Sequence, residues 1–460
     1  MCQGTKQTVR EQGTFLPKPR TEGEIVSKRL VFLLCAALAC AVLVAACGGD
    51  DDGGGGATPG TEETGATEGV KAVDPASMEN AKGEVTYCSG KDTSGDLKET
   101  IAEFNKDNPD LQVKLVEFPE DAQQQHDQFV QRQKAKSGDC DAFEEDVVWT
   151  AEFASQKWLM DMSDYIETRK DDFIPSTLET VTFDGKVFGA PRVSDAGMMY
   201  YRTDQVKEFP ATWQELYTEA EKGDGIVYQG SAYEGLTVDY LEYAFAAGGT
   251  VLNEDGSKST IDSPENLEAL KFMVDGIKNG AAPKAVTTMQ EEPARRAWEA
   301  GKATFMRNWS YCYALSQKAP NVKGKFAVAP YPEWEGGGKA AVLGGHNMVI
   351  SVYSKNPGGA LKFIDYATSP ERITKNAVKY SKTPTIGSSY DDAGVKKAMP
   401  FADALRQGVE NAKSRPVSPV YPEISEAIFK NVNEALAGQT SPEDALKKAD
   451  EQINAALQAF

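Results

Sequence analysis

The sequence predicts an α/β fold in which a parallel sheet is covered by crossover helices. Strand-like and helix-like segments alternate between residues 83 and 149, with short connections, and the alternation returns between residues 185 and 309. This order is typical of parallel sheets, because each parallel connection needs a helix-length crossover. The length of 460 residues is ample for two lobes, each with its own core.

The first of these regions carries five predicted elements. An apolar run at 85–88 ends in Ser-Gly and is a predicted strand. The next segment, 96–109, is a predicted amphipathic helix that Asn-Pro closes. Its residues Leu97, Ile101 and Phe104 recur at helical spacing. The other elements are a strand at 113–118, a helix at 125–139 and a strand at 144–149.

Helix start signals mark the later elements. Thr212 and Glu215 have the capping-box spacing, which predicts a helix over 212–223. Ser-Pro pairs open predicted helices at 263–280 and 441–460. Strands are predicted at 185–193 and 198–204, and residues 292–309 run from a helix into a strand.

The charge and the histidine count exclude several functions. The formal net charge is −20, which argues against nucleic-acid binding, because phosphates require a basic face. His126 and His346 are the two histidines, and no CxxC or HExxH spacing occurs. We therefore expect no zinc site, no metal and no cofactor, and histidine-based acid–base catalysis has few candidates.

The N-terminal region indicates export and lipid attachment. A basic patch at 27–29 precedes an uncharged apolar run at 30–46, which is shorter than a spanning helix needs. Residues 44–47 read Val-Ala-Ala-Cys and resemble the bacterial lipoprotein box, so residues 1–46 are a predicted signal peptide and Cys47 the lipidated residue. A plain transmembrane anchor is the alternative, and Cys40 is a weaker lipidation candidate.

Two further features flank this signal. Residues 1–25 are long and polar for a signal peptide, and a misplaced translation start would explain them. Residues 48–82 contain mainly Gly, Asp, Glu, Thr and Pro. Such a composition buries too little apolar surface to fold, so residues 47–82 are a predicted lipidated, disordered tether.

Six ordered motifs resemble the extracellular solute-binding proteins (family 1) of sugar ABC transporters, most closely the trehalose/maltose-binding branch. The resemblance spans about residues 83–460. The motifs are DVVWTAEFA (146–154), APRVSDAGMMYYRTD (190–204), YEGLTVDYLEYAFAAGG (233–249), FMRNWSYCYAL (305–315), VLGGHNMVIS (342–351) and a long C-terminal motif that begins with RPVSPVYPE (415–449).

The resemblance implies a periplasmic-binding-protein-like fold of two α/β lobes joined by a hinge, with the ligand cleft between them. Lobe one would comprise residues 83–192 and 347–385, and lobe two residues 193–346 and 386–460. The implied function is to close on an oligosaccharide or disaccharide of the trehalose or maltose type and to deliver it to a permease.

A sugar site needs hydrogen-bonding groups at its edge and an aromatic plane against the C–H face of the ring. Trp309 is the aromatic residue that packs on a sugar in the resembling family, and Tyr311 is a second candidate. Both residues could instead belong to the core, where most aromatic residues lie.

Polar candidates follow from the hinge, the strand ends and the resemblance. Asp195 lies in the first expected hinge crossing, and Asp92, Thr150 and Glu152 follow predicted strands, where ligands gather in open α/β sheets. Caps, turns and solvated helix faces are the alternative roles. The resemblance adds three residues: Tyr233, Glu234 and Arg415, the last of which could also form a structural salt bridge.

Departures from the family pattern concern the identity of the sugar. Where the family has the motif LGGW, this chain reads Leu343-Gly344-Gly345-His346, so a histidine replaces the usual tryptophan. Gly345 and His346 remain binding candidates. Ile386 stands where an arginine is usual. The pair Tyr200 and Tyr201 could suggest iron binding, but neighbours in a strand point to opposite faces, which argues against it.

Three cysteines remain in the mature chain once Cys47 carries lipid: Cys88, Cys140 and Cys312. Disulfides persist outside the cytoplasm. Cys88 ends the first predicted strand and Cys140 precedes the third, so Cys88–Cys140 is the favoured pair and Cys312 a buried thiol.

We therefore expect a monomeric, non-enzymatic binding protein that is lipid-anchored outside the cytoplasm, with a carbohydrate and permease subunits as partners. Two alternatives remain open. The chain could bind another solute, such as a polyamine, peptide or iron. Less favoured is a secreted glycoside hydrolase that uses two of the carboxylates, for which the sequence has no independent signature.

Overall fold

The computed structural model describes residues 69–460, which form two α/β lobes, each built around its own sheet. The predicted signal peptide, Cys47 and most of the predicted tether lie outside the described residues. Among residues 69–460, no helix combines the length and apolarity needed to cross a membrane.

Lobe one contains a five-stranded sheet of order β2-β1-β3-β11-β6. β1 is parallel to β2 and β3, as the sequence predicts, whereas β11 runs antiparallel to β3 and β6. The sheet is therefore mixed. Its strands are β1 (Gly83–Ser89), β2 (Leu111–Glu117), β3 (Ala142–Asp146), β6 (Gly189–Ala196) and β11 (Leu343–Ile350).

Helices cover both faces of this sheet, and two apolar clusters fill the space between them. The helices are α1 (Asp96–Asp107), α2 (Ala122–Lys134), α3 (Thr150–Ser155), α4 (Ser163–Glu167), α5 (Pro175–Glu179), α11 (Pro357–Ala367) and α12 (Pro370–Tyr380). The short segments are η1 (Pro75–Met78), η2 (Lys170–Asp172) and the hairpin of β4 (Thr182–Phe183) and β5 (Lys186–Val187).

Lobe two contains a four-stranded sheet of order β10-β7-β9-β8 and one large apolar core. Its strands are β7 (Met198–Arg202), β8 (Ile226–Val227), β9 (Phe305–Asn308) and β10 (Phe326–Ala329). Its helices are α6 (Trp213–Lys222), α7 (Glu234–Ala246), α8 (Pro264–Asn279), α9 (Glu291–Glu299), α10 (Cys312–Ser316), α13 (Ala393–Ala398), α14 (Ala402–Asn411), α15 (Tyr421–Leu436) and α16 (Pro442–Ala459), with η3 (Lys284–Thr288) and η4 (Gly387–Asp391). The predicted capping box of Thr212 and Glu215 is present.

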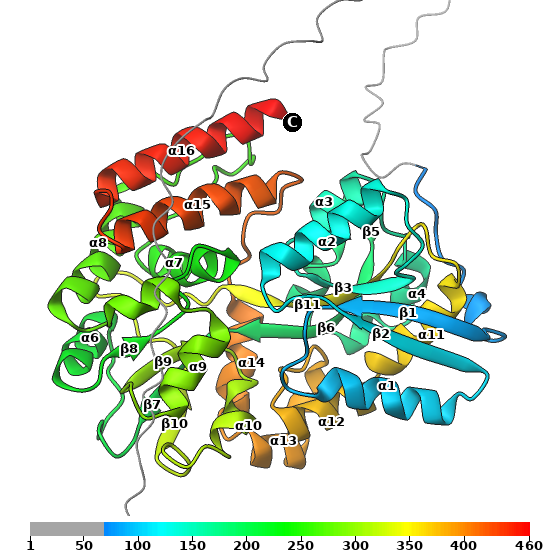
Figure 1. The fold of residues 1–460 in the computed structure, drawn as a ribbon, viewed down its shortest axis with the longest axis horizontal. Coiled ribbons are helices and arrows are strands. Elements are labelled where there is room, and N and C mark those ends of the chain that lie inside the picture. The colour runs from blue at the N-terminus through cyan, green and yellow to red at the C-terminus, as the bar shows by residue number, and fades with distance from the viewer. Residues whose placement is uncertain (1–68) are drawn as a thin grey trace, which may run out of the picture. The chain divides into compact units, whose positions relative to one another are not determined.

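Two antiparallel strands of the first sheet lead into the second lobe (Figure 1). β6 ends at Ala196 and β7 starts at Met198 in the other sheet, while β11 begins at Leu343, opposite Ala196. The expected lobe boundary between residues 192 and 193 therefore falls inside a continuous strand, because β6 stays paired with β11 beyond it.

Residues 70–82, which the sequence analysis assigns to the tether, instead pack against lobe one. The Val73 amide donates to the Asp161 carbonyl at 3.0 Å, and the Val73 side chain is buried. Ala72 forms a β-bridge with Asp161, and η1 follows, with Asp74 as its cap. A few apolar residues within the polar stretch are enough to hold this segment against the lobe.

A disulfide joins Cys88 in β1 to Cys140 just before β3, the pairing that the sequence favours. The two cysteines are 52 positions apart in the chain and both are buried. Cys312 is a buried free thiol in the core of lobe two. The disulfide therefore links two neighbouring strands of the lobe-one sheet.

Removing this disulfide should destabilise the protein. We expect the Cys88→Ala/Cys140→Ala variant to lose about 2–4 kcal/mol of unfolding free energy, because its unfolded chain is less constrained. Urea denaturation with and without reductant measures the loss. Cys312→Ala is the matched control and should keep the wild-type sensitivity to reductant. A double variant that remains sensitive to reductant would contradict the assignment.

Glu145 in β3 is a fully buried acid on the lobe-one sheet. Thr150 Oγ1 donates to Glu145 Oε1 at 2.5 Å and also to the Thr180 carbonyl at 2.8 Å, so α3 begins against β3. Burial raises the pKa of Glu145 from 4.5 to about 8. The folded chain therefore retains a proton that the unfolded chain has already released in this range of pH.

The pKa of Glu145 predicts how stability depends on pH. Between pH 4.5 and about 8 the folded state binds the extra proton, so Glu145 should lower the unfolding free energy as pH rises through this window. Glu145→Gln removes this term. The stability of the variant relative to wild type should rise by roughly 1.4 kcal/mol per pH unit at most. Urea denaturation across the window measures it, with exposed Glu84→Gln as control; parallel curves for wild type and Glu145→Gln would contradict it.

Candidate functional site

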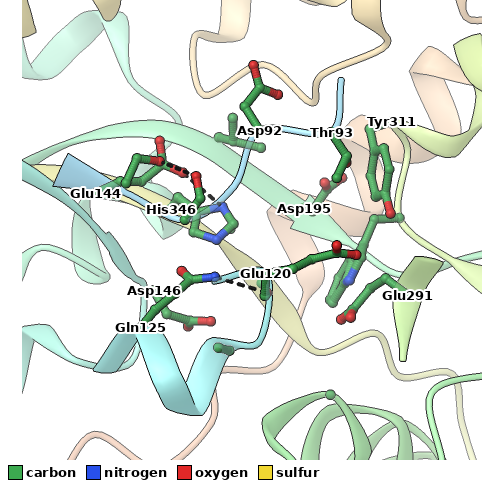
Figure 2. Close-up of a pocket in the computed structure, with 18 of the residues that line it drawn as sticks. Asp92, Thr93, Glu120, Gln125, Glu144, Asp146, Asp195, Glu291, Tyr311 and His346 are labelled. Atoms are coloured by element: carbon green, nitrogen blue, oxygen red, sulfur yellow. Dashed lines mark hydrogen bonds and ion pairs between the residues drawn. The ribbon is translucent and has the colours of Figure 1, made fainter. Parts of the chain in front are cut away.

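A cavity lies between the two lobes, where the carboxyl ends of β1 and β3 meet β6, β11 and the first turns of α7 and α9. Its unfilled space, including water at the open mouth, is about 1230 Å³. Figure 2 shows side chains of both lobes around it. Among the lining residues are Asp92, Gln125, Glu144, Asp146, Trp149, Arg192, Asp195, Tyr233, Glu234, Glu291, Glu292, Trp309, Tyr311, Gly345, His346, Lys382 and Arg415.

Trp309 and Tyr311, the aromatic candidates, both line the cavity from the segment after β9. Each side chain is half-buried, so each leaves part of a ring for a ligand. The Tyr311 hydroxyl donates to Glu292 Oε1 at 2.9 Å, and Lys382 Nζ lies 5.5 Å from its ring centre. These contacts fix the ring of Tyr311 between α9 of lobe two and the segment that follows α12.

Asp195 faces the cavity from the end of β6 and is held by hydroxyl groups. Thr383 donates to its carboxylate, and Thr383 in turn is 2.7 Å from the hydroxyl of Ser310 in lobe two. Burial raises the pKa of Asp195, and hydrogen bonding to Thr383 opposes this rise. The three side chains tie β6 to the loop after β9 and to residue 383.

Arg415 bridges the lobes. Its Nη2 donates to Asp146 Oδ1 of β3 at 2.9 Å, and its Nη1 donates to Glu234 Oε1 of α7 at 2.6 Å. The guanidinium is almost fully buried, and Glu234 also accepts from Tyr421 and Ser425, each at 2.5 Å. The structural salt bridge considered for Arg415 is therefore present, at a position that also lines the cavity.

Asp92 and Tyr233 lie at the cavity wall with local partners. Asp92 accepts from the amides of Ser94, Gly95 and Leu97, so its carboxylate caps the start of α1. The Tyr233 side chain is buried, and burial raises the pKa of its hydroxyl, with the nearby Glu291 adding to the rise. These contacts leave both side chains less available to a ligand than Trp309.

His346 and Gly345 form part of the cavity floor on β11. Nearly half of the His346 side chain is exposed, and its Nδ1 lies 3.9 Å from Glu144 Oε1. Gly345 has φ +126°, and a Cβ there would lie 2.1 Å from the Val193 carbonyl oxygen, so only glycine fits. Ile386, the other departure from the family pattern, is buried in the lobe-one core and does not line the cavity.

Two candidates, Thr150 and Glu152, lie outside the cavity, and this corrects the sequence expectation. The predicted strand at 144–149 ends at Asp146, and a turn over residues 147–149 directs α3 away. Thr150 therefore binds Glu145 and the Thr180 carbonyl. Glu152 instead lies 2.6 Å from Nε2 of His126.

Several lining residues escaped the sequence analysis. Arg192 of β6 donates to Asp96 and, at 3.0 Å, to Glu144 Oε2. Burial raises the pKa of Asp96, but the charges of Arg192 and Lys382, together with hydrogen bonds from Ser94 and the Leu97 amide, outweigh burial and lower this pKa to about 2. Arg192, Asp146 and Trp149 stand inside the quoted motifs, so a signal existed. Glu291 and Lys382 had none.

Comparisons with known proteins agree with this architecture. The family model described as bacterial extracellular solute-binding protein matches residues 89–372. A probable ABC transporter-binding protein of Deinococcus radiodurans is 37% identical over 362 residues, which cover 74% of this chain and 86% of that protein. An arabinooligosaccharide-binding protein of Halalkalibacterium halodurans is 25% identical over 393 residues, covering 79% and 86%.

Among solved structures, maltose-bound MalE3 of T. maritima superposes with a TM-score of 0.77 at 38% identity, covering 80% of this chain and 98% of that one. The family match covers most of both lobe-one segments and the first of the two segments of lobe two. Fold, interlobe cavity and sequence therefore agree: the chain belongs to the family of bacterial extracellular solute-binding proteins.

Proposed function

We propose that this chain is the lipid-anchored substrate-binding component of a carbohydrate ABC importer. It captures a disaccharide or oligosaccharide of the maltose or trehalose type, closes around it and delivers it to the permease. It acts as a monomer and catalyses no reaction. The observation that carries this proposal is an interlobe cavity that combines half-buried aromatic rings with polar side chains from both lobes.

The chemistry of the cavity suits a sugar. Trp309 and Tyr311 offer ring surface on the lobe-two side, against which the C–H face of a pyranose packs. Asp195 and Glu144 can accept hydrogen bonds from the hydroxyl groups of a sugar.

Contacts between the lobes support closure about the hinge. Besides the bond from Arg415 to Asp146, Gln290 Nε2 of lobe two donates to Asp121 Oδ2 of lobe one at 2.7 Å. Both bonds join groups that an opening of the cavity would separate. Ligand binding would add further contacts between the lobes and so favour the closed arrangement.

Relatives support the carbohydrate class. The T. maritima protein, which is 38% identical to this chain, has maltose bound in its structure. The relative from H. halodurans is named for arabinooligosaccharide binding. The D. radiodurans relative is named as an ABC transporter-binding protein, which supports a permease as partner.

Ligand-induced stabilisation tests the sugar class. We expect maltose or trehalose to raise the Tm of the mature chain carrying Cys47→Ser, since a ligand that binds only the folded state stabilises it. Trp309→Ala should weaken the affinity at least about tenfold by removing the stacking surface. A thermal-shift screen followed by calorimetry measures both effects.

Trp334→Ala is the matched control, because this tryptophan is buried in lobe two and does not line the cavity. It should lower Tm but keep the ligand-induced shift. No shift with any saccharide or polyol would contradict the carbohydrate proposal, and a shift with polyamines or peptides would support the alternative solute class.

Cell fractionation tests the lipid anchor. In a bacterial host, Cys47→Ser should move the protein from the membrane to the soluble fraction and abolish the incorporation of labelled palmitate. Cys40→Ser is the matched control and should leave both unchanged. Continued palmitate labelling of Cys47→Ser would contradict the assignment of the lipidated residue.

A further inference from the structure

The indole of Trp309 rests on a buried guanidinium. The Arg307 Cζ atom lies 4.0 Å from the centre of the Trp309 ring, a short distance for a cation–π contact. Arg307 is 1% exposed, whereas Trp309 is half-buried and lines the cavity. Arg307 therefore lies inside lobe two behind the indole, and Trp309 forms part of the cavity surface in front of it.

Four buried side chains hold Arg307 in place. Its Nη2 donates to Glu242 Oε1 at 2.6 Å, and its Nη1 donates to Gln229 Oε1 at 2.8 Å. Its Nε lies 2.9 Å from Asp239 Oδ1 and 2.9 Å from the Tyr331 hydroxyl. These partners come from α7, the segment after β8 and the segment after β10. The guanidinium is thus fixed in position and orientation by three separate parts of lobe two.

The far end of the indole meets the hinge strand β11. A Cβ at Gly344 would lie 2.6 Å from Cη2 of Trp309, so the ring approaches the backbone of this strand closely. The Trp309 amide also donates to Asn308 Oδ1 at 2.9 Å. Arg307 and the β11 backbone therefore both limit the plane of the indole, while the amide hydrogen bond fixes the main chain from which it projects.

Stability alone is a weak reason for this cluster. Two carboxylates and one guanidinium lose their hydration when buried, and apolar side chains of similar volume are often as stabilising. Burial also raises the pKa of Asp239 and Glu242, which the Arg307 charge opposes. What an apolar replacement would not supply is a flat, charged surface of fixed orientation beneath the indole.

We propose that Arg307 is a positioning residue for ligand stacking: it fixes the plane of Trp309 through the buried cluster with Asp239, Glu242, Gln229 and Tyr331. The proposal rests on the proposed function, in which a sugar ring packs on Trp309. Arg307 itself is buried behind the indole and acts on the ligand through that ring.

The first test reads the position of Trp309 without any sugar. The protein is the mature chain carrying Cys47→Ser, and the signal of Trp309 is the difference from the same protein with Trp309→Phe. The variant Arg307→Met/Asp239→Asn/Glu242→Gln leaves no ionisable group at these three positions and is called the neutral variant. In it we expect acrylamide quenching of the Trp309 signal to rise about twofold or more and the near-UV circular dichroism of Trp309 to fall. Arg372→Lys, a buried arginine of lobe one, is the control and should change neither.

The second test is a double-mutant cycle on the affinity for maltose or trehalose. The neutral variant should bind about tenfold more weakly in the Trp309 background, and less than about twofold more weakly in the Trp309→Ala background. The conservative variant Arg307→Lys keeps the charge but has no planar group, so it should show an intermediate loss. It also serves as the test if the neutral variant does not fold.

Unchanged quenching in both folded Arg307 variants would overturn the proposal. An equal loss of affinity in the two Trp309 backgrounds would also overturn it, because Arg307 would then act through general stability. If no sugar binds the wild-type protein, the sugar proposal fails, whereas the quenching experiment still decides whether Arg307 positions Trp309.

Discussion

The antiparallel pairing of β6 with β11 is the interaction on which the rest of the structure depends. The register runs from Leu343 opposite Ala196 to Val349 opposite Gly189, with an irregularity between His346 and Asn347. Both strands belong to the lobe-one sheet and both continue into lobe two, so the same hydrogen bonds define the sheet edge and the link between lobes (Figure 1). Asp195 and His346 reach the cavity because this pair forms its floor.

Burying charge beside this floor imposes a second constraint, which three arginines satisfy in the same way. Arg192 lies between Asp96 and Glu144 in lobe one, Arg307 between Asp239 and Glu242 in lobe two, and Arg415 between Asp146 and Glu234 across the lobes. Each guanidinium meets two carboxylates, because an unpaired buried charge would be costly. Only the third pairing spans both lobes, so only there does desolvation of charge couple directly to their separation.

Much of the fold and part of the site could be predicted from the sequence, and the failures have physical causes. Local patterns located β1, α1 and the capping box of α6, because each depends on neighbouring residues. Thr150 and Glu152 were wrongly placed in the cavity because Val147, Val148 and Trp149 extend an apolar run past the true strand end at Asp146. These three residues form a turn. Because the turn packs against the protein interior, its residues are as apolar as those of a strand.

The sequence did not predict the cavity-lining residues Glu291 and Lys382, for a different reason. Each stands outside the quoted motifs, and each reaches the cavity only because distant segments fold beside β9 and β6. The disulfide partners were easier, since strand order alone brings Cys88 near Cys140. Long-range packing thus decided which predictions could succeed.

The replacement of the usual tryptophan by His346 changes how the two lobes share the proposed ligand. Trp149 and Tyr233 line the cavity but are almost fully buried, so they offer little ring surface. The half-buried rings Trp309 and Tyr311 both stand on lobe two, whereas the lobe-one side presents His346 and Glu144. In the proposed function, stacking therefore falls mainly on lobe two and hydroxyl recognition on lobe one. Because the stacking surface lies mainly on lobe two, a small tilt of Trp309 would weaken contacts along the whole face of the sugar ring. This is the physical reason for a rigid support of the indole by Arg307.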